Sequence, residues 1–179
     1  MSAIQIHGKY FVPYLSEQQI QEKVKALAAT LDNDYAGKKP LFIAILNGSF
    51  MFAADIFKYL KIEAEICFIK LASYKGTKSS GQVVTAIGLD IDLTNRHVII
   101  LEDIIDTGKT VFHLTREAEK LKPASITVAT LLQKHILRPN LIKGDYIGFE
   151  IPDVFVVGYG LDYNEEGRNW NGVYQLDEK

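Results

Sequence analysis

Three carboxylates stand directly after an apolar segment in the middle of the chain. Residues 98–101 are all apolar and rich in β-branched side chains, which is typical of a parallel strand buried on both faces. Glu102, Asp103 and Asp106 follow, and a Thr-Gly-Lys-Thr turn at 107–110 then opens a helical stretch. Backbone N–H groups at the start of a helix bind phosphate, whereas carboxylates suit sugar hydroxyls and hydrated Mg²⁺. This order of residue types predicts an enzyme that acts on a phosphorylated sugar.

The turn differs from the phosphate-binding loop of nucleoside triphosphatases. Residues 108–110 match the end of that loop, but its first glycine would fall where this chain has Asp103. A carboxylate there would repel a triphosphate, so the sequence argues against an ATPase. A simpler alternative is an acidic loop in which Asp106 or Thr107 caps a helix, although this leaves Glu102 and Asp103 without a role.

Strands and helices alternate around this segment. A capping box at 16–19 predicts a helix to about residue 36, and apolar periodicity predicts further helices at 50–60 and 110–121. Strands are expected at 41–46, 62–71, 82–87, 98–101, 126–132 and, as the last one, 155–158. The order predicts an α/β fold with a mainly parallel central sheet and helices on both faces, and such sheets bind ligands beyond the carboxyl ends of their strands.

Three blocks of the sequence resemble a known family. Residues 102–110 are similar to the phosphoribosyl pyrophosphate (PRPP) motif of type I phosphoribosyltransferases, in the form found in hypoxanthine-guanine phosphoribosyltransferases. Residues 156–165, followed by Arg168, resemble the purine-binding stretch of that family, and residues 46–49 resemble its pyrophosphate loop more weakly. The resemblance implies one type I domain over residues 1–179, with a small hood formed by the chain ends. It also implies purine salvage, in which 5-phosphoribosyl moves from PRPP to hypoxanthine, and to guanine as a second base, giving IMP or GMP and pyrophosphate.

The resemblance assigns roles to the first block. Attack of the purine on ribose C1 builds positive charge on the ribose and negative charge on the departing pyrophosphate. Glu102 and Asp103 would accept hydrogen bonds from the ribose hydroxyls and help to hold Mg²⁺, both at the solvent edge of their strand. Asp106 is the candidate general base that takes the N7 proton, with a helix N-cap as its alternative role. The 5′-phosphate would be held by the amides and hydroxyls of Thr107, Gly108, Lys109 and Thr110.

Pyrophosphate would be held at a second place. Gly48 lets the backbone approach an anion closely, and the adjacent helix directs its N–H groups there. Family members often carry Lys or Arg where this chain has Asn47, and often have a cis peptide bond at this place. Arg168 matches the family's pyrophosphate-contacting arginine, the alternative being a solvated surface arginine. The long segment 72–81 resembles the family's mobile lid, with Ser73 and Tyr74 in place of its Ser-Tyr pair, although its composition also suits an ordinary surface loop.

Purine recognition falls on four residues in the resemblance. Lys134 would donate to the exocyclic O6, and its alternative is a lysine that extends along the surface into solvent. Phe155 would stack on the base, although an aromatic residue in an apolar run is by default a core residue. Val156 would act through its backbone, and Asp162 would bind either a second Mg²⁺ or the base edge.

Composition limits the class of protein. The net charge of −2 and the mixed charges along the chain offer no broad basic surface for nucleic acid or an anionic membrane. One cysteine cannot form an internal disulfide, the four histidines lack metal-ligand spacing, and no apolar run approaches the span of a bilayer. The start of the chain lacks the features of a signal peptide, so a cytoplasmic protein is expected. The family is commonly dimeric or tetrameric.

Two alternative functions remain open. The first is a regulator that keeps the PRPP-binding fold without catalysis, and the presence of Asp106, Lys134, Asp162 and Arg168 together argues against it. The second is a PRPP-dependent transferase that acts on adenine, orotate or xanthine. Lys134 carries only hydrogen-bond donors, which argues against adenine because its N6 group is also a donor. Xanthine remains open.

Overall fold

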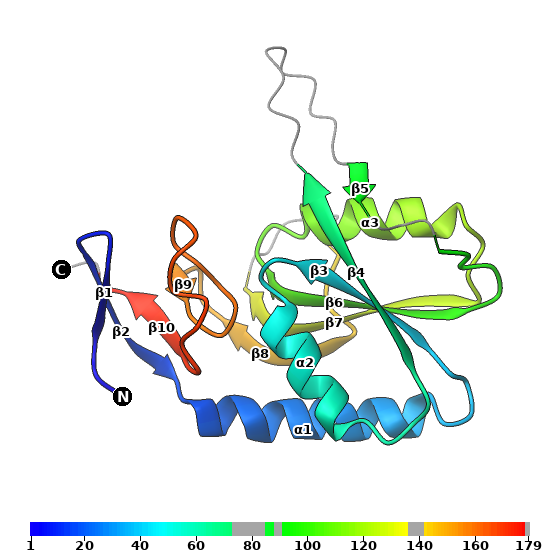
Figure 1. Ribbon diagram of the computed structural model, residues 1–179, viewed down its shortest axis with the longest axis horizontal. Helices are drawn as coiled ribbons and strands as arrows, with labels where there is room; N and C mark the ends of the chain where they lie inside the picture. The colour runs from blue at the N-terminus through cyan, green and yellow to red at the C-terminus, as the bar shows by residue number, and fades with distance from the viewer. Residues whose placement is uncertain (73–84, 88–90, 136–141, 178–179) are drawn as a thin grey trace, which may run out of the picture.

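A central sheet with helices on both faces forms the body of the protein (Figure 1). The computed structural model describes residues 1–72, 85–87, 91–135 and 142–177. Within these residues the central sheet has six strands, of which five run parallel and one, at the edge, pairs antiparallel with its neighbour. In spatial order they are β5 (Thr85–Ile87), β4 (Glu65–Ala72), β3 (Leu41–Leu46), β6 (His97–Ile105), β7 (Ser125–Lys134) and β8 (Tyr146–Ile151).

Three described helices cover the two faces of this sheet. Helices α1 (Glu17–Asp34) and α2 (Phe50–Tyr59) pack together on one face, and α3 (Lys109–Glu119) covers the other. Strand β3 contributes alternate residues to the two cores: Phe42 lies in the cluster under α1 and α2, whereas Ile43 lies in the cluster under α3. Burial on both faces explains why this strand is wholly apolar, and it confirms the predicted α/β layering.

A second, antiparallel sheet forms the expected hood from both ends of the chain. Its described strands, in spatial order, are β1 (Ile4–Ile6), β2 (Lys9–Leu15), β10 (Val173–Leu176) and β9 (Val156–Val157). A small core of Ile4, Ile6, Phe11, Val157 and Tyr174 holds it together. In Figure 1 the hood stands beside the carboxyl ends of β3 and β6.

Several sequence-based boundaries were wrong. The strand predicted at 155–158 is β9 of the hood, and β10 follows it, so it is not the last strand. Strand β8 was missed because Gly148 and the charged Glu150 interrupt its apolar pattern. Strand β6 runs to Ile105 rather than ending at residue 101, which places the acidic pair inside the strand. Apart from Ala72, the segment predicted as a lid lies outside the described residues.

The first helix begins at the predicted capping box. Ser16 Oγ accepts a hydrogen bond from the Gln19 N–H, and Gln19 Oε1 accepts one from the Ser16 N–H. Ile20, Val24, Leu27 and Leu31 then face the core. No helix among the described residues is long and apolar enough to cross a membrane.

Removing the cap should weaken α1. We expect Ser16→Ala to lower the free energy of unfolding by about 1 kcal/mol, because the Gln19 N–H loses its partner. Thr30→Ala in the same helix is the control: its exposed hydroxyl bonds only to Ala26 O, and alanine favours helix, so no loss is expected. Urea unfolding measures both variants. Equal stability of Ser16→Ala and the parent would contradict the role of the capping box.

Candidate active site

The three sequence blocks meet where β3 and β6 end. A Cβ built on Gly48, just after β3, would lie 1.6 Å from Oδ2 of Asp103 on β6. A Cβ built on Gly160, just after β9, would lie 2.0 Å from the carbonyl oxygen of Gly48. Neither position can accept a larger residue without movement of backbone or of a buried carboxylate. Close backbone approach therefore brings segments from both sheets into one site.

The acidic pair is buried, contrary to the expectation that it lies at the solvent edge of its strand. Glu102 and Asp103 expose 8% and 9% of their surface, because β6 continues past them and pairs with β7. Burial raises the pKa of Glu102 well above its ordinary value, and the nearby Asp103 charge adds to the rise. Oε2 of Glu102 has no hydrogen-bond partner among the described residues.

Asp103 has a milder environment than its neighbour. Burial raises its pKa to about 6, although backbone N–H groups at Ile104 and Asp103 and the positive charge of Arg168 act in the opposite direction. The negative charge of Asp162 adds to the rise. Two buried carboxyls with raised pKa values at one strand end are typical of a functional site rather than of a solvated helix cap.

The loop after β3 has the geometry that the resemblance implies. The Leu46–Asn47 peptide bond is cis. The Asn47 residue is exposed, and Ser49 is buried, its hydroxyl donating to Ile45 O at 2.6 Å. Helix α2 begins immediately afterwards at Phe50. The loop therefore presents the start of a helix beside the buried Asp103.

The turn after β9 holds Arg168. Gly158, Tyr159 and Gly160 all have positive φ angles, of 96°, 50° and 97°. Arg168 Nη1 donates to Gly160 O at 2.9 Å, and Arg168 Nη2 lies 2.8 Å from Asp162 Oδ1. The Arg168 side chain is only 21% exposed, so the alternative of a solvated surface arginine was wrong.

Asp106 and Lys134 face each other across the ends of β6 and β7. The Lys134 ammonium lies 3.3 Å from Asp106 and 2.9 Å from Asp153, and its side chain is 12% exposed. Burial would lower the pKa of Lys134, but the hydrogen bonds and charges of Asp153 and Asp106 outweigh it and raise the pKa. Lys134 is therefore a fixed cation rather than a surface lysine.

The start of α3 is open to an anion. Its N-cap is Gly108, at φ 69°, so Asp106 does not cap this helix. No described side chain caps the first turn, which leaves its N–H groups available. Gly108 is buried, Thr107 is half-buried, and Lys109 and Thr110 are exposed.

Phe155 belongs to the hood and follows Asp153, which contacts Lys134, by two residues. It is 45% exposed, so its default assignment to the core was wrong. Its ring packs against Phe11 and Tyr163, with ring centroids 6.3 Å and 5.7 Å away. Val156 is buried and pairs with Gln175 of β10, which fixes its backbone beside this ring. The structure thus offers a supported aromatic face next to a strand.

The carboxylates predicted to hold metal do not form a closed cage. No group of three or more His, Cys, Asp or Glu side chains in the described ranges is arranged to bind a metal ion. Asp162 is paired with Arg168 and accepts a hydrogen bond from the Glu165 N–H. The unpartnered oxygen of Glu102 and the neighbouring Asp103 would nevertheless be suited to hold Mg²⁺, because this cation prefers oxygen ligands.

Two residues near the site were missed from the sequence. Asp153 contacts Lys134, and Asp55 on α2 is buried and bonded to Tyr159 beside Gly160. Asp55 carried a usable signal: it lies among Phe52, Ala53 and Ile56 on the buried face of α2, where a carboxylate requires partners. Asp153 lies in an exposed turn and gave no comparable signal.

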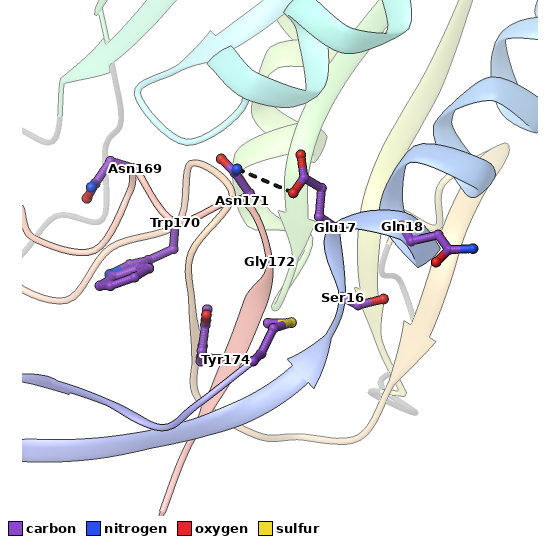
Figure 2. A pocket seen from close by; sticks show the side chains of 9 residues that line it. Ser16, Glu17, Gln18, Asn169, Trp170, Asn171, Gly172 and Tyr174 are labelled. Carbon is purple, nitrogen blue, oxygen red and sulfur yellow. Dashed lines mark hydrogen bonds between the residues drawn. The ribbon is translucent and has the colours of Figure 1, made fainter.

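A separate pocket lies at the junction of the hood and α1 (Figure 2). It has a volume of about 460 Å³ and is lined by Met1, residues 16–18 and residues 169–172 with Tyr174. Asn171 donates to Glu17 across it, and the Trp170 ring packs edge-on against Tyr174. None of the residues assigned to catalysis or substrate binding lines this pocket, so it is distinct from the candidate site.

Known proteins share this sequence and fold. The model of the phosphoribosyl transferase domain matches residues 14–164. The chain is 44% identical over 156 residues to the hypoxanthine-guanine phosphoribosyltransferase of Bacillus subtilis strain 168, and the aligned residues cover 87% of each chain. It superposes on a hypoxanthine-guanine phosphoribosyltransferase from Bacillus anthracis with a TM-score of 0.83 at 38% identity, covering 93% of this chain and 97% of that one.

A more distant relative superposes equally well. A variant hypoxanthine phosphoribosyltransferase from Trypanosoma cruzi, solved as a ternary complex with substrates, gives a TM-score of 0.85 at 34% identity and covers 93% and 95% of the two chains. The identity and coverage of these relatives agree with the match of the domain model and with the contacts between the three sequence blocks. The chain therefore belongs to the phosphoribosyl transferase family, among the hypoxanthine-guanine phosphoribosyltransferases.

Proposed function

We propose that the chain transfers 5-phosphoribosyl from PRPP to hypoxanthine, and to guanine as a second base, giving IMP or GMP and pyrophosphate. The observation that carries this proposal is the contact between blocks distant in sequence. The Asp103 carboxylate approaches Gly48 too closely for a Cβ there, and the Gly48 carbonyl oxygen approaches Gly160 in the same way. Lys134 pairs with Asp106. Proteins of the same family that carry this activity in their names support it.

PRPP binding falls on the ends of β6 and β3. The uncapped first turn of α3 and the hydroxyls of Thr107 and Thr110 would hold the 5′-phosphate. Glu102 and Asp103 would accept hydrogen bonds from the ribose hydroxyls, with Mg²⁺ bound beside them. When bound, Mg²⁺ supplies positive charge against the pyrophosphate oxygens. A divalent cation would also stabilise the charged forms of two carboxyls whose pKa values are raised by burial.

Pyrophosphate would lie against the loop after β3. Gly48 gives it backbone access, and the start of α2 directs N–H groups towards it. Arg168 would add a guanidinium charge, since it is held by Gly160 O close to this loop. Asn47 would contribute its backbone N–H rather than a charged side chain.

The purine would lie between Phe155 and Lys134. Lys134 would donate to O6, and Phe155 would stack on the ring beside the Val156 backbone. O6 and N7 occupy neighbouring positions on one edge of a 6-oxopurine, and Asp106 lies 3.3 Å from the Lys134 ammonium. Asp106 is therefore suited to take the N7 proton as N9 attacks C1. Asp162 would act at the base edge or on a metal ion.

Further properties follow from the family. We propose a single catalytic domain over residues 1–179, a cytoplasmic enzyme, and assembly as a homodimer or homotetramer. The segment 72–81, with Ser73 and Tyr74, would close over PRPP. Small-molecule substrates, rather than nucleic acid or membrane, would be the partners.

Turnover of four bases tests the proposal directly. Hypoxanthine, guanine, xanthine and adenine are each supplied with PRPP and Mg²⁺, and nucleotide and pyrophosphate are measured. We expect turnover of hypoxanthine and guanine. Absence of turnover with every base would favour a binding protein with this fold, and turnover of adenine alone would contradict the assigned role of Lys134.

Removing the general base should slow the chemical step. We expect Asp106→Ala to lower kcat by about 10² to 10⁴, with PRPP affinity little changed, because proton transfer contributes to the transition state. Asp106→Asn keeps the shape and should show a similar loss. Pre-steady-state turnover measures this step, and a loss below about tenfold would exclude Asp106 as the base.

Neutralising the acidic pair should raise the stability of the protein and weaken its binding of Mg-PRPP. Because the folded state holds Glu102 and Asp103 at raised pKa values, it binds more protons than the unfolded chain. We therefore expect stability in EDTA to fall as the pH rises from about 4 through 6 and above. Glu102→Gln with Asp103→Asn should reduce this fall and add about 1–3 kcal/mol near pH 8, while weakening Mg-PRPP binding.

Urea unfolding across pH and calorimetric titration with Mg-PRPP measure the two effects. Glu119→Gln is the control, since Glu119 pairs with Arg116 on the exposed face of α3 and should change neither measurement appreciably. A double variant with the parent's pH profile and the parent's Mg-PRPP affinity would remove the pair from the site.

Base choice should depend on Lys134. A site built around a lysine donor leaves adenine's N6 donor without a partner, which can cost about 10⁴ in selectivity. We expect Lys134→Gln to lower kcat/KM strongly for hypoxanthine and less, or not at all, for adenine, because the amide can also accept. Lys143→Gln, at an exposed position before β8, is the control. A competition assay with both bases measures the ratio, and unchanged selectivity would assign O6 recognition elsewhere.

A further inference from the structure

A buried carboxylate on α2 joins three parts of the fold. Asp55 is 8% exposed and accepts hydrogen bonds from Gln21 on α1, from Lys58 one turn along α2 at 2.8 Å, and from the Tyr159 hydroxyl at 2.7 Å. The Tyr59 hydroxyl donates in turn to Gln21 Oε1. Asp55 is not itself among the residues that approach the proposed substrates.

Asp55 is held in its charged form. Burial alone would raise its pKa, but the hydrogen bonds from Lys58, Tyr159 and Gln21 outweigh burial and lower the pKa below its ordinary value. The bond from Tyr159 is therefore a hydroxyl donating to a carboxylate, which is stronger than a bond between neutral groups. Both partners are buried, so water cannot readily replace it.

Tyr159 occupies a costly backbone conformation. Its φ is 50°, between two glycines that also have positive φ, and a non-glycine residue there costs about 1 kcal/mol or more. The turn is held by backbone bonds from Tyr159 N–H to Trp170 O and from Gly160 N–H to Arg168 O. The hydroxyl–carboxylate bond is its side-chain anchor on α2.

This turn sets the position of the groups proposed to bind pyrophosphate. Gly160, the next residue, lies against the carbonyl oxygen of Gly48. The carbonyl oxygen of Gly160 accepts the hydrogen bond from Arg168. Gly48 in turn precedes α2, the helix that carries Asp55. Asp55, Tyr159, Gly160 and Gly48 therefore form a closed path, in which a shift of Tyr159 would move Arg168 relative to the loop after β3.

We propose that Asp55 is a positioning residue for phosphoribosyl transfer, which through Tyr159 holds Gly160 and Arg168 in register with the Gly48 loop. The proposal rests on the pyrophosphate role assigned above to Gly48 and Arg168. Loss of the Asp55–Tyr159 bond should act on PRPP and pyrophosphate, and should spare the base, whose proposed contacts are with Lys134 and Phe155.

Tyr159→Phe removes a single oxygen atom and keeps the buried ring. We expect it to raise KM for PRPP, and KM for pyrophosphate in the reverse reaction with IMP, about fivefold or more, with KM for hypoxanthine changed less than twofold. Asp55→Asn should give the same pattern. The two changes together should raise these KM values no further than either change alone, because both remove the Tyr159–Asp55 bond.

Lys58→Met is the matched control. Its ammonium also bonds to Asp55, but Lys58 is exposed and has no contact with the 158–161 turn among the described residues. It should leave every KM at the parent value even where thermal unfolding shows lower stability. A purely structural role for Asp55 predicts instead that Tyr159→Phe and Lys58→Met both lower the unfolding temperature and leave KM unchanged, which would overturn the proposal.

Arg168→Gln separates the two inferences. If it raises KM for pyrophosphate while Tyr159→Phe does not, Arg168 keeps its role and the positioning role of Asp55 is wrong. If neither variant raises it, the assigned pyrophosphate site is wrong and the proposal fails with it. The proposal is supported if both Arg168→Gln and Tyr159→Phe raise KM for pyrophosphate, and if the effects of Asp55→Asn and Tyr159→Phe on this KM are not additive.

Discussion

The close approach of the loop after β3 to a buried carboxylate on one side, and to the turn after β9 on the other, is the constraint on which the site depends. Asp103 lies against Gly48, and Gly48 lies against Gly160, with no room for a Cβ at either glycine. These residues come from β6, the loop after β3 and the turn after β9, so the contact joins the central sheet to the hood. Positions that only glycine fits fix where the loop after β3 and the turn after β9 meet.

This arrangement buries two carboxyl groups where their charged forms are disfavoured. Glu102 and Asp103 lie inside a strand whose neighbouring residues Ile100, Leu101 and Ile105 are buried. Burial raises the pKa of both carboxyls, so their ionisation opposes folding as the pH rises towards neutral. The apolar clusters on both faces of the sheet stabilise the fold and so compensate for the burial of these carboxyls. In the proposed function, a cation and the ribose hydroxyls would be the partners of these two carboxyls.

Local patterns predicted the elements and the acidic motif, because those signals lie within a few residues of each other. The capping box at Ser16 and the apolar residues of β3 are examples. Burial of Glu102 could not be predicted, since it depends on β7 pairing beyond the apolar run. The Asp55–Tyr159 bond spans 104 positions, and only the fold brings its ends together. Strand β8 lacked a clear apolar period, and its position depends on β7.

In the proposed function, the ion pair of Lys134 and Asp106 would let base choice and catalysis share one contact. Their charged groups lie 3.3 Å apart, and Asp153 holds the ammonium from the other side. In the proposed arrangement, a purine that offers O6 to Lys134 presents the adjacent N7 to Asp106, so correct recognition also aligns the proton with its acceptor. A purine with a donor at position 6 meets the ammonium unfavourably and moves N7 away. The same ion pair would thus select the base and position it for reaction, without a separate selectivity element.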